Sequence, residues 1–403
     1  MIAGKASVLR VVNRGVVLGL IRAMQPISRS QIAKLSGLNP STVSDVASAL
    51  LREDLIYERI GDAIGPGRTP IDLYLKCDGH FVGAIEIGAS LSRVAVADIC
   101  GNLKSYSSLP TDKSNPPQTL SRCAEKLLAL SNSLGIDPPR TIGVSISGVV
   151  DPGNARLVVS PNLQWQNVCV GDILRDMIPL AENVVAGDTV KAAALAEMLF
   201  GNNVTDLSNF FFLSIGESVG AGIIIDGRVV LGDHYASGEL SHMAIYENGL
   251  PCKCGVRGCW DAYISDPAIS SRYTTALGEP IGPDSHVGIG EIILRASTGD
   301  EVASSVIKQT GHYIGVGIAT IMKALDPQCV VIDGAIADAW ELIHPEIMNV
   351  LGERPLPGAD NFVDVFPVSK SNKECLKGPV ALAIQGVFDG YKIMEASPWK
   401  TLR

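Results

Sequence analysis

The sequence predicts an α/β protein that begins with a winged helix-turn-helix domain and continues as a larger α/β body. The chain has 403 residues, 46% of them apolar and 19% charged, which is more than one compact core usually holds. Residues 1–76 carry ten Lys and Arg against six Asp and Glu, a net charge of +4, so with the total at −9 the remaining residues carry −13. A basic segment ahead of an acidic body is typical of a nucleic-acid-binding domain joined to a second function.

Three helices are expected in this basic segment. Apolar residues recur at helical spacing over 10–24. A second helix is expected to begin at the S-x-x-Q capping box that Ser28 forms with Gln31, and to end at Gly37. A third begins at Pro40, whose missing N–H costs nothing at the first position of a helix, and runs to about residue 53.

Two strands, 55–60 and 71–75, are expected to follow as a hairpin with a glycine-rich tip. Arg59 and Arg68 flank that tip. Three helices and a basic hairpin are the outline of a winged helix-turn-helix domain, which we expect over residues 1–76.

Small polar side chains lie at the start and on one side of the third helix. Helices that read the major groove carry such groups on their first turns, and nearby basic side chains hold phosphates. An ordinary solvated helix face has the same composition, but the attached basic hairpin favours DNA binding. The expected DNA contacts are Ser41, Thr42, Ser44, Asp45, Ser48, Arg52, Arg59 and Arg68.

From residue 81 the pattern changes to apolar strands that alternate with helices. Glycine-turned hairpins open two sets of elements, one over 81–98 and one over 210–225. Because a hairpin is followed by helices in both sets, a duplicated fold closing on a cleft is expected. The other expected elements are strands at 142–146, 184–186 and 330–332 and helices at 190–200 and 313–325.

Membrane insertion and secretion are not expected. The apolar stretches 81–99 and 209–225 are interrupted by Glu86, Arg93 and Glu217, whereas a span needs about 18 uninterrupted apolar residues. Basic residues also interrupt the first apolar stretch of the chain, so no secretory signal is expected. We therefore expect a cytoplasmic protein whose nine cysteines are thiols or metal ligands.

The most specific motif combines three cysteines and one histidine. Three thiolates and one imidazole complete a tetrahedral zinc site and leave no open position, so a structural zinc ion is expected. Three of the nine cysteines fall within eight residues, which makes ordinary buried thiols the weaker interpretation. The expected ligands are His242, Cys252, Cys254 and Cys259. The scattered cysteines are expected to be core or surface thiols: Cys77, Cys100, Cys123, Cys169, Cys329 and Cys375.

Two glycine-rich turns, 86–90 and 216–222, have the composition of backbone phosphate sites, although each is a weak signal alone. Glu86 and Glu217 would repel a nucleotide unless a cation lay between them, so a plain hairpin turn is favoured for the first. Five further polar residues suit the hydroxyls of a sugar, yet singly each is typical of a turn or a surface. They are Asn162, Asp188, Glu239, His242 and Asp261, and Asp188 also suits a base that activates an attacking hydroxyl.

These segments together resemble the ROK family, which groups repressors, uncharacterised open reading frames and sugar kinases. The likeness covers essentially the whole chain and is most specific at 238–242 with the cysteine cluster. It implies an actin-like or hexokinase-like two-lobed body with sugar in the cleft, assembled as a homodimer or homotetramer. The other segments that carry it are 28–56, 67–70, 160–165 and 213–232.

The lobes are expected at residues 77–190 with 380–403 and at 191–379, the second holding the zinc loop. The resemblance places all five polar residues at sugar contacts and lets the imidazole of His242 touch both zinc and ligand. Asp261 stands where the family usually has Glu, so its shorter side chain leaves that contact to water or favours a different sugar.

The kinase machinery departs from the family pattern. The first phosphate loop of the family reads Asp-x-Gly-Gly-Thr, and here it is Glu86-Ile87-Gly88-Ala89-Ser90. Gly187 replaces the Asn that usually precedes Asp188, and Asp-Gly-Ala at 333–335 replaces a diglycine near the adenosine site. Phosphoryl transfer depends on positioning and charge neutralisation, so no kinase activity is expected.

The sequence therefore predicts a sugar-responsive transcriptional regulator, with repression relieved by ligand as the commoner pattern in the family and activation as the other. A sugar or sugar derivative would shift lobe closure and so reposition the domains on operator DNA. Two alternatives stay open: an ATP-dependent sugar kinase that kept a DNA-binding domain, and a body that docks on a sugar-transport component.

Overall fold

The computed structural model describes residues 3–61, 71–201, 204, 207–278, 287–355, 363–369 and 376–389. The chain divides into two compact units, residues 1–192 with 375–403 and residues 193–374. Below, "head" denotes the described residues 3–76, "first lobe" the rest of the first unit, and "second lobe" the second unit. The tip of the hairpin between residues 60 and 71, with Arg68, lies outside the described residues. Cys375 also lies outside them.

The head contains the three helices that the sequence predicts: α1 (Ala3–Met24), α2 (Arg29–Ser36) and α3 (Pro40–Arg52). The capping box is confirmed, because the Ser28 amide donates to Gln31 Oε1 at 2.8 Å and the Gln31 amide donates to Ser28 Oγ at 3.3 Å. Gly37 ends α2 in the left-handed region, with φ of 70°, where a glycine is favoured.

A three-stranded antiparallel sheet completes the head: β1 (Ile27–Ser28), β3 (Ile71–Leu75) and β2 (Ile56–Ile60), in that spatial order. Apolar side chains of the helices and of the sheet, for example Val43, Leu50 and Leu73, are fully buried and form the core of the head. The predicted hairpin strands are confirmed, and the core between helices and sheet fixes the orientation of α3.

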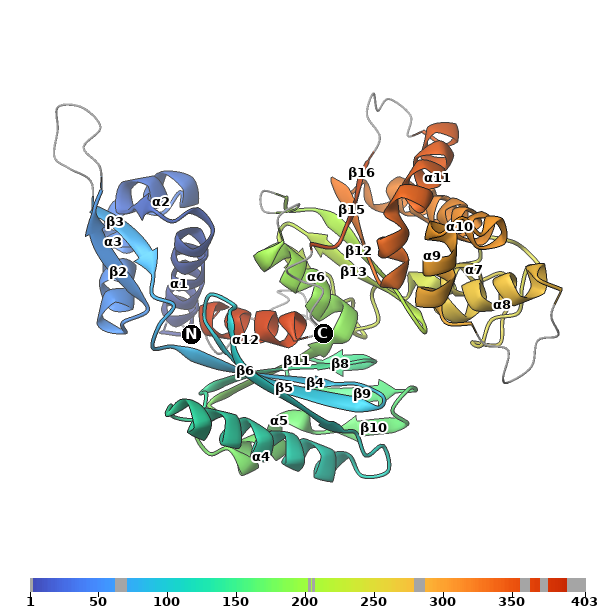
Figure 1. The fold of residues 1–403 in the computed structure, drawn as a ribbon. Coiled ribbons are helices and arrows are strands. Elements are labelled where there is room, and N and C mark those ends of the chain that lie inside the picture. Colours follow the sequence, from blue (N-terminus) through green and yellow to red (C-terminus); the bar gives the residue numbers. More distant parts are fainter. Residues whose placement is uncertain are drawn as a thin grey trace. The chain divides into compact units, whose positions relative to one another are not determined.

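The first lobe is built on a five-stranded mixed sheet. Its strands in spatial order are β11 (Asn183–Asp188), β7 (Thr141–Ile146), β4 (Phe81–Ile87), β5 (Leu91–Asp98) and β6 (Leu103–Pro110). Figure 1 shows α12 (Lys377–Asp389) on one face of this sheet, and α4 (Pro116–Leu134) with α5 (Val170–Met177) on the other. A second, small sheet follows β7: β8 (Val149–Asp151), β9 (Arg156–Ser160) and β10 (Trp165–Val168).

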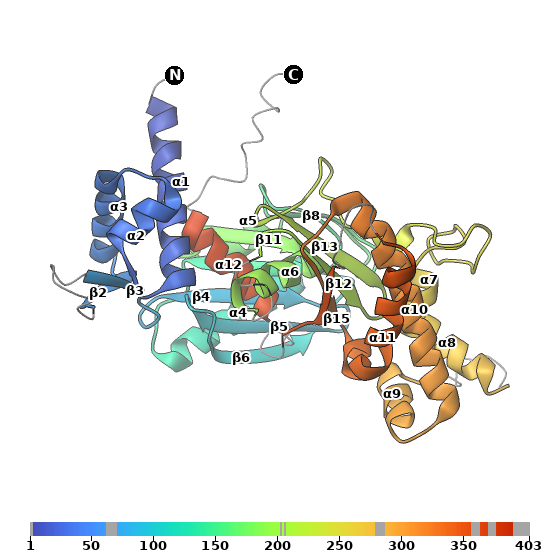
Figure 2. The same cartoon turned by 90° about the horizontal axis from the view of Figure 1, so that it is seen from above.

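Helix α12 lies so close to the sheet that β7 needs a glycine. A Cβ atom at Gly143 would stand 1.9 Å from the carbonyl oxygen of Pro379 and 2.7 Å from the amide nitrogen of Ala383, both in α12. The same helix also packs against α1 of the head, as the two views in Figures 1 and 2 agree, and the guanidinium of Arg22 lies 5.9 Å from the ring centre of Phe388. Helix α12 therefore joins the lobe to the head.

The second lobe repeats the layout of the first. Its strands in spatial order are β14 (Arg228–Val229), β13 (Val219–Ile225), β12 (Phe210–Ile215), β15 (Cys329–Asp333) and β16 (Asp364–Pro367). In both sheets three antiparallel strands are followed by two strands added in parallel. The predicted duplication is thus confirmed at the level of strand order.

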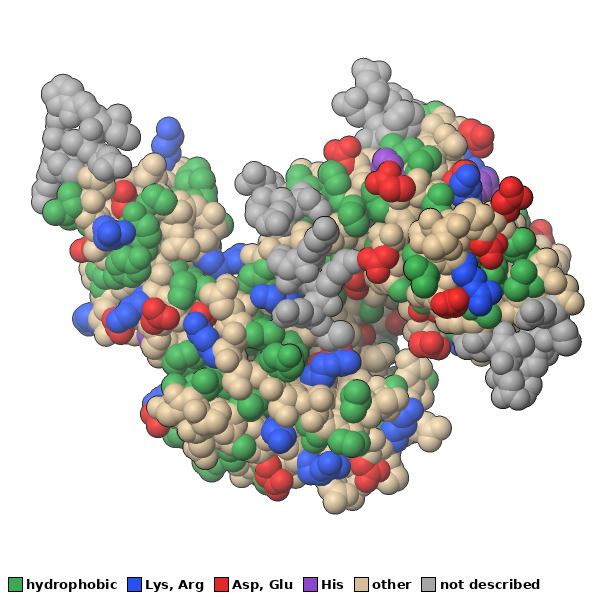
Figure 3. Space-filling model, in the orientation of Figure 1, with side chains coloured by type: hydrophobic (Ala, Val, Ile, Leu, Met, Phe, Trp, Pro, Cys, Tyr) green, Lys and Arg blue, Asp and Glu red, His purple; other side chains and the backbone are tan. Residues whose placement is uncertain are grey.

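Helices of the second lobe cover its sheet with a core of buried apolar side chains. The longest described helix is α10, which packs against α11 and α9. The helical elements are α6 (Thr189–Phe200), which begins in the first unit, η1 (Leu240–His242), α7 (Asp261–Ile264), α8 (Asp266–Ala276), α9 (Ile289–Ser297), α10 (Glu301–Leu325), η2 (Ala335–Ala339) and α11 (Trp340–Glu353). Figure 3 shows acidic side chains spread over the drawn face of this lobe. In the described part of the chain, no helix is both long and apolar enough to cross a membrane.

Candidate functional site

Four side chains of the second lobe have the geometry of a tetrahedral metal site. The candidate ligand atoms of His242, Cys252, Cys254 and Cys259 all lie within 4.8 Å of one another. His242 Nδ1 is 3.7 Å from the Cys252 sulfur, and the sulfurs of Cys254 and Cys259 are 3.6 Å apart. Metal–sulfur bonds of about 2.3 Å place the corners of a tetrahedron about 3.7 Å apart, so the four residues fit a tetrahedral metal ion.

The loop that carries the cysteines turns at two glycines. Gly255 and Gly258 have φ of 92° and 80°, in the region that residues with a Cβ rarely adopt. At Gly258 a Cβ would also stand 1.7 Å from the carbonyl oxygen of Tyr246. The amide of Cys252 donates to the carbonyl of Val256 at 2.8 Å, which closes the turn between the first and last sulfurs.

The loop is fixed to the core of the lobe by the residue after its last cysteine. Trp260 is fully buried, and its indole N–H donates to the carbonyl of Tyr313 in α10 at 2.8 Å. Gly317 lies under the indole, where a Cβ would stand 2.1 Å from a ring carbon. On the other side of the loop the Tyr263 hydroxyl accepts from the amide of Leu250 at 2.8 Å. The candidate metal site is therefore part of the packed lobe.

Burial and hydrogen bonding act in opposite directions on two of the thiols. Burial and, after it, the neighbouring Cys254 and Cys252 together raise the pKa of Cys259 to about 12. A hydrogen bond from the backbone of Val256 lowers the pKa of Cys254. A metal ion must displace the proton of a bound thiol, so the affinity of such a cluster for metal rises with pH.

Of the five predicted sugar contacts, three lie in the second lobe. Glu239 and His242 are exposed and stand at the two ends of η1, so the structure brings them together. Asp261 is only 5% exposed: one carboxylate oxygen accepts from the amide of Val219 at 2.9 Å, and the other lies 3.7 Å from the Lys253 ammonium. Asp261 therefore holds the start of β13 beside the metal loop.

The other two predicted sugar contacts lie in the first lobe. Asn162 is exposed in the turn between β9 and β10. Asp188 is half-buried at the start of α6, where one carboxylate oxygen accepts from the amides of Val190 and Lys191 at 3.0 and 3.1 Å. Its other oxygen accepts from the amide of Gly148 at 3.3 Å. The side chain of Asp188 is thus oriented by three backbone amides.

The first glycine-rich turn carries a carboxylate that already has a cation. Glu86 and Arg93 are cross-strand partners in the β4–β5 hairpin, and Arg93 Nη1 lies 2.7 Å from Glu86 Oε2. The Glu86 side chain is 9% exposed. Arg93 was not predicted as the partner of Glu86, although a hairpin turn centred on Gly88 to Ser90 places the two residues opposite each other.

The second glycine-rich turn is shorter than its sequence suggests. Strand β13 begins at Val219, so Gly220 and Gly222 lie within the strand and only 216–218 form the turn. Burial, with the nearby charge of Glu217, raises the pKa of Asp266 to about 6. The carboxylates of Glu217, in this turn, and of Asp266 therefore lie close enough to interact.

The polar face of α3 is exposed. Ser41, Ser44, Asp45, Ser48 and Arg52 are all exposed, and Thr42 is half-buried. The opposite face, with Val43, Ala47 and Leu50, is fully buried in the head. Arg59 is exposed on β2. The predicted DNA contacts that the structure describes thus lie on an accessible surface, and Arg68 falls outside the described residues.

One prediction about the cysteines is wrong. Cys77 and Cys100, expected as separate thiols, form a disulfide with Cα atoms 5.4 Å apart. Twenty-three positions separate them in the sequence, but β4 and β5 pair up to Phe81 and Asp98, and the Ile99 amide donates to the carbonyl of His80 at 3.2 Å. The hairpin therefore brings the residues just beyond its open end side by side.

Two curated relatives match nearly the whole chain, the head included. The xylose repressor of Bacillus spizizenii is 26% identical over 388 residues, covering 96% of this chain and 98% of the relative. The transcriptional dual regulator NagC of Escherichia coli, described as DNA-binding, is 26% identical over 399 residues, covering 96% of each protein.

Solved structures are similar to this chain as well. A crystal structure described as a ROK family transcriptional regulator, homologous to the Mlc protein of E. coli, matches with a TM-score of 0.82 at 26% identity, covering 95% of this chain and 98% of that one. A ROK family glucokinase from Streptomyces griseus matches 76% of this chain with a TM-score of 0.64 at 24% identity, which is a likeness of fold. The ROK family itself matches residues 82–386, and the chain belongs to that family.

Proposed function

We propose that this chain is a sugar-responsive transcriptional regulator, a repressor that binds operator DNA through its head and a sugar or sugar derivative through its body. The observation that carries the proposal is the face of α3. Ser41, Ser44, Ser48 and Arg52 recur every three or four residues and Asp45 follows Ser44, so they share one exposed side of a helix whose other side is buried. A helix held in this way presents short polar groups to base edges and a guanidinium to phosphate.

The relatives support this proposal because their likeness includes the head. The xylose repressor and NagC are matched over 96% of this chain, whereas the glucokinase structure covers 76% of it. The domain boundaries that we propose are 1–76 for a winged helix-turn-helix domain, 77–190 with 380–403 for the first lobe, and 191–379 for the second. A repressor works where the DNA is, so the proposed location is the cytoplasm.

The sugar is proposed to contact Asn162, Asp188, Glu239, His242 and Asp261. The three backbone amides on Asp188 orient its carboxylate, and η1 places Glu239 beside His242. Asp261 is engaged with Val219, so it would act on the ligand through the strand that it holds. Closure of the lobes around the sugar would change the spacing of two heads in a homodimer or homotetramer, and so release the operator.

A structural zinc ion is proposed at His242, Cys252, Cys254 and Cys259. The ion would hold η1 against the cysteine loop, because His242 ends η1. When one ring nitrogen binds metal, the other is left for a ligand hydroxyl, so zinc would set the position of a sugar contact.

The variant Cys254→Ser tests the metal site. We expect zinc measured by elemental analysis to fall from about one ion per chain. The thermal stabilisation by sugar should fall with it, because binding of a structural ion stabilises the folded loop. Cys169→Ser is the matched control, since Cys169 is an exposed thiol in the first lobe, and it should leave both values unchanged. Full zinc content in the Cys254 variant would refute the assignment.

The body is proposed not to transfer phosphate. A kinase carboxylate at position 86 would have to hold magnesium, whereas here Arg93 already neutralises it. The kinase alternative is favoured by the fold shared with the glucokinase and by Asp188 as a candidate base. Turnover in a coupled assay with ATP, magnesium and a panel of hexoses, pentoses and amino sugars, abolished by Asp188→Asn, would establish that alternative.

The decisive experiment selects DNA fragments from a genomic library on the full-length protein and measures their affinity with and without each sugar of the panel. We expect retention of specific fragments, loss of retention in a Ser44→Ala/Ser48→Ala variant, and release by one sugar class. A Ser133→Ala/Thr298→Ala variant, altered at two exposed positions of the lobes, serves as the control. Phosphorylation of a sugar with no retention of any fragment would overturn the proposal.

A further inference from the structure

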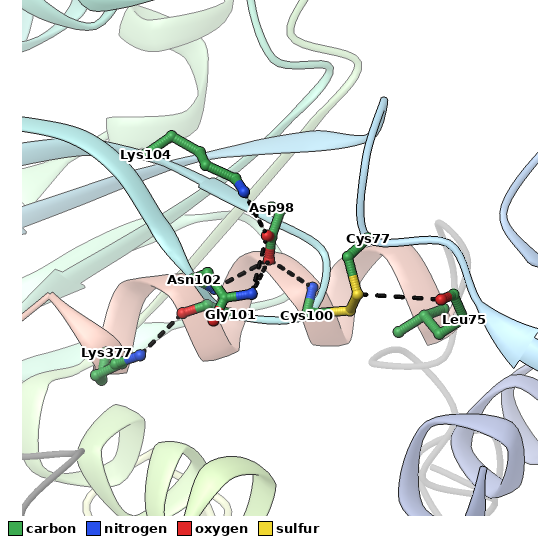
Figure 4. Close-up of polar contacts among 8 residues, drawn as sticks. All are labelled: Leu75, Cys77, Asp98, Cys100, Gly101, Asn102, Lys104 and Lys377. Atoms are coloured by element: carbon green, nitrogen blue, oxygen red, sulfur yellow. Dashed lines mark hydrogen bonds and ion pairs between the residues drawn. A yellow bond between two sulfur atoms is a disulfide. The ribbon is translucent and has the colours of Figure 1, made fainter. Parts of the chain in front are cut away.

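The disulfide between Cys77 and Cys100 lies at the joint between the head and the first lobe. Cys77 comes two residues after β3, the central strand of the head sheet, and Cys100 lies in the turn between β5 and β6 of the first lobe. Figure 4 shows the bond between the sulfurs joining these two segments. The bond thus ties the connector that follows β3 to the turn between β5 and β6.

The lobe holds its side of this bond firmly. The carboxylate of Asp98, 1% exposed, accepts from the amides of Cys100 and Asn102 at 2.9 and 3.0 Å and lies 3.0 Å from the ammonium of Lys104. The ammonium of Lys377, at the start of α12, donates to the carbonyl of Gly101 at 2.9 Å (Figure 4). These contacts fix the backbone at Cys100 independently of Cys77.

The head holds the connector through weaker contacts. The carboxylate of Asp54, in the turn before β2, lies 2.6 Å from the ammonium of Lys76, and the Asp54 carbonyl lies 3.1 Å from His80 Nε2. Both side chains of the Asp54–Lys76 pair are exposed, and such pairs contribute little. Beside them is a cavity of about 1000 Å³, lined by Glu53 and Leu55 of the head and by residues of the lobe such as Pro138 and Arg140. The joint is thus hollow next to the connector, and α1 of the head packs against α12 of the lobe.

We propose that the Cys77–Cys100 pair is a reversible redox site that tethers the head to the first lobe. Disulfides are rare in the reducing compartment where transcriptional regulators work, and those found there are mostly catalytic or redox-sensing. Both cysteines are half-buried, so small oxidants and reductants reach them. A site of this kind needs no contribution from the metal cluster or the sugar contacts.

The chemistry requires a peroxide and a dithiol as co-reactants. One thiolate attacks a peroxide oxygen, which breaks the O–O bond, takes the sulfur to a sulfenic acid and releases water. The second thiol then attacks that sulfur, which forms the S–S bond and releases a second water, so two thiols and one hydrogen peroxide give one disulfide and two waters. A dithiol reductant reverses the reaction by exchange and leaves as a disulfide.

The oxidised state should bind DNA more tightly, and this consequence rests on the proposed function. With the bond formed, residues 76–80 connect the head to the lobe in one conformation, so two heads of an assembled regulator keep one spacing. With the bond open, the connector gains freedom that DNA binding must remove, which lowers affinity. We expect reduction to weaken binding to a selected DNA fragment by about fivefold or more.

The test uses the full chain equilibrated in glutathione buffers of increasing oxidised fraction. Mass spectrometry after alkylation counts the thiols at Cys77 and Cys100, limited proteolysis reports the exposure of 76–80, and fluorescence anisotropy gives affinity for a selected DNA fragment. We expect the disulfide, protection of the connector and tighter DNA binding to appear together. Zinc measured in the same samples shows that the cysteine cluster is intact.

Two variants keep the result interpretable. Cys77→Ser should abolish all three responses and bind DNA like the reduced wild type, whereas Cys169→Ser, which removes an exposed thiol elsewhere, should keep them. Alkylation of Cys77 and Cys100 throughout the redox range, or equal DNA affinity of both states, would overturn the proposal. Failure of the proposed function looks different: no DNA is retained in either state, while thiol counts and proteolysis still change with redox buffer.

Discussion

At the scale of single residues, Glu86 bears most directly on the proposal that the body does not transfer phosphate. In the first lobe its carboxylate lies at the end of β4, in the turn that resembles the first phosphate loop of ROK sugar kinases. Its buried side chain faces Arg93 across the hairpin at 2.7 Å, so the charge that would hold a metal ion is already neutralised. A buried carboxylate with such a partner is costly to leave alone.

Arg93→Ala should therefore destabilise the first lobe by about 1–3 kcal/mol, because it leaves the Glu86 carboxylate buried without that cation. Urea unfolding monitored by circular dichroism measures the loss. Arg140→Ala is the matched control: the pair of Arg140 with Glu182 has both side chains exposed, so its removal should change the free energy of unfolding by less than about 0.5 kcal/mol. Equal effects of the two variants would contradict the assigned role of Arg93.

Asp266 gives a prediction about pH. Its pKa is raised to about 6 by burial and then by the charge of Glu217, and one carboxylate oxygen has no hydrogen-bond partner among the described residues. The folded chain therefore holds this proton more tightly than the unfolded chain, so the stability that the protonated form contributes is present below about pH 4 and is lost as pH rises to about 6. Asp266→Asn should be more stable than the wild type at pH 7, by about 1 kcal/mol, and this gain should vanish near pH 4.

Asp300 provides the control of opposite sign. The amide of Ala303 donates to its carboxylate at 2.9 Å and, with the hydroxyl of Tyr273, lowers its pKa. The stability that the ionised Asp300 carboxylate contributes is present above its ordinary pKa and is lost as pH falls. Asp300→Asn should therefore lose stability at pH 7 and converge with the wild type in acid, as thermal unfolding across pH 3 to 8 would show. A parallel pH profile for the two variants would rule out this account.

At the scale of elements, a helix that packs directly against a strand leaves no room for a side chain at the contact, so that position needs a glycine. Gly143→Ala in β7 should lower the stability of the first unit by about 2–3 kcal/mol, because its Cβ would meet the backbone of α12 at 1.9 Å. Gly290→Ala in α9 is the matched control, since no atom lies within 4 Å of the added Cβ, and it should stabilise by up to about 0.5 kcal/mol. Thermal unfolding measures both, and tolerance of Gly143→Ala would mean that α12 moves away freely.

Elements with local signals could be predicted from the sequence. The capping box at Ser28 and the left-handed glycine at Gly37 fixed the bounds of α2, and the hairpin strands of the head were found from their flanking turns. Helix α12 and the small sheet β8 to β10 were not identified, because they depend on packing against strands far away in the sequence. The long helix α10 was found only in its second half, since its first half holds fewer apolar residues.

The sites divide in the same way. The metal cluster was found because three of its ligands lie within eight residues, and the chemistry of thiolates and imidazole is specific. The partner of Glu86 and the bond between Cys77 and Cys100 were missed, because each needs the register of the β4–β5 hairpin. The arrangement of sugar contacts from two lobes remains a prediction, since the sequence places them only by resemblance.

At the scale of the whole molecule, charge separates the basic head from the acidic body. Binding to DNA should weaken steeply with salt, with a slope of log affinity against log salt of about −0.9 for each phosphate contact. Arg52→Ala should reduce this slope by about one for each head bound, because Arg52 is exposed at the end of α3. Lys323→Ala, exposed on α10 in the second lobe, should leave the slope unchanged. Anisotropy titrations from 50 to about 300 mM salt measure both, and a flat response would exclude phosphate contacts.

Helix α12 also has a consequence for how the protein is made. It completes the layer over β4, β7 and β11 and supports α1, yet about 190 residues are translated between the end of β11 and its first turn. At the usual speed of a ribosome this interval lasts about 10–40 s, during which the front of the nascent chain exposes an uncovered sheet face. Early segments of this protein should therefore be strong clients of ribosome-associated chaperones, and release from them should coincide with the emergence of its last described helix.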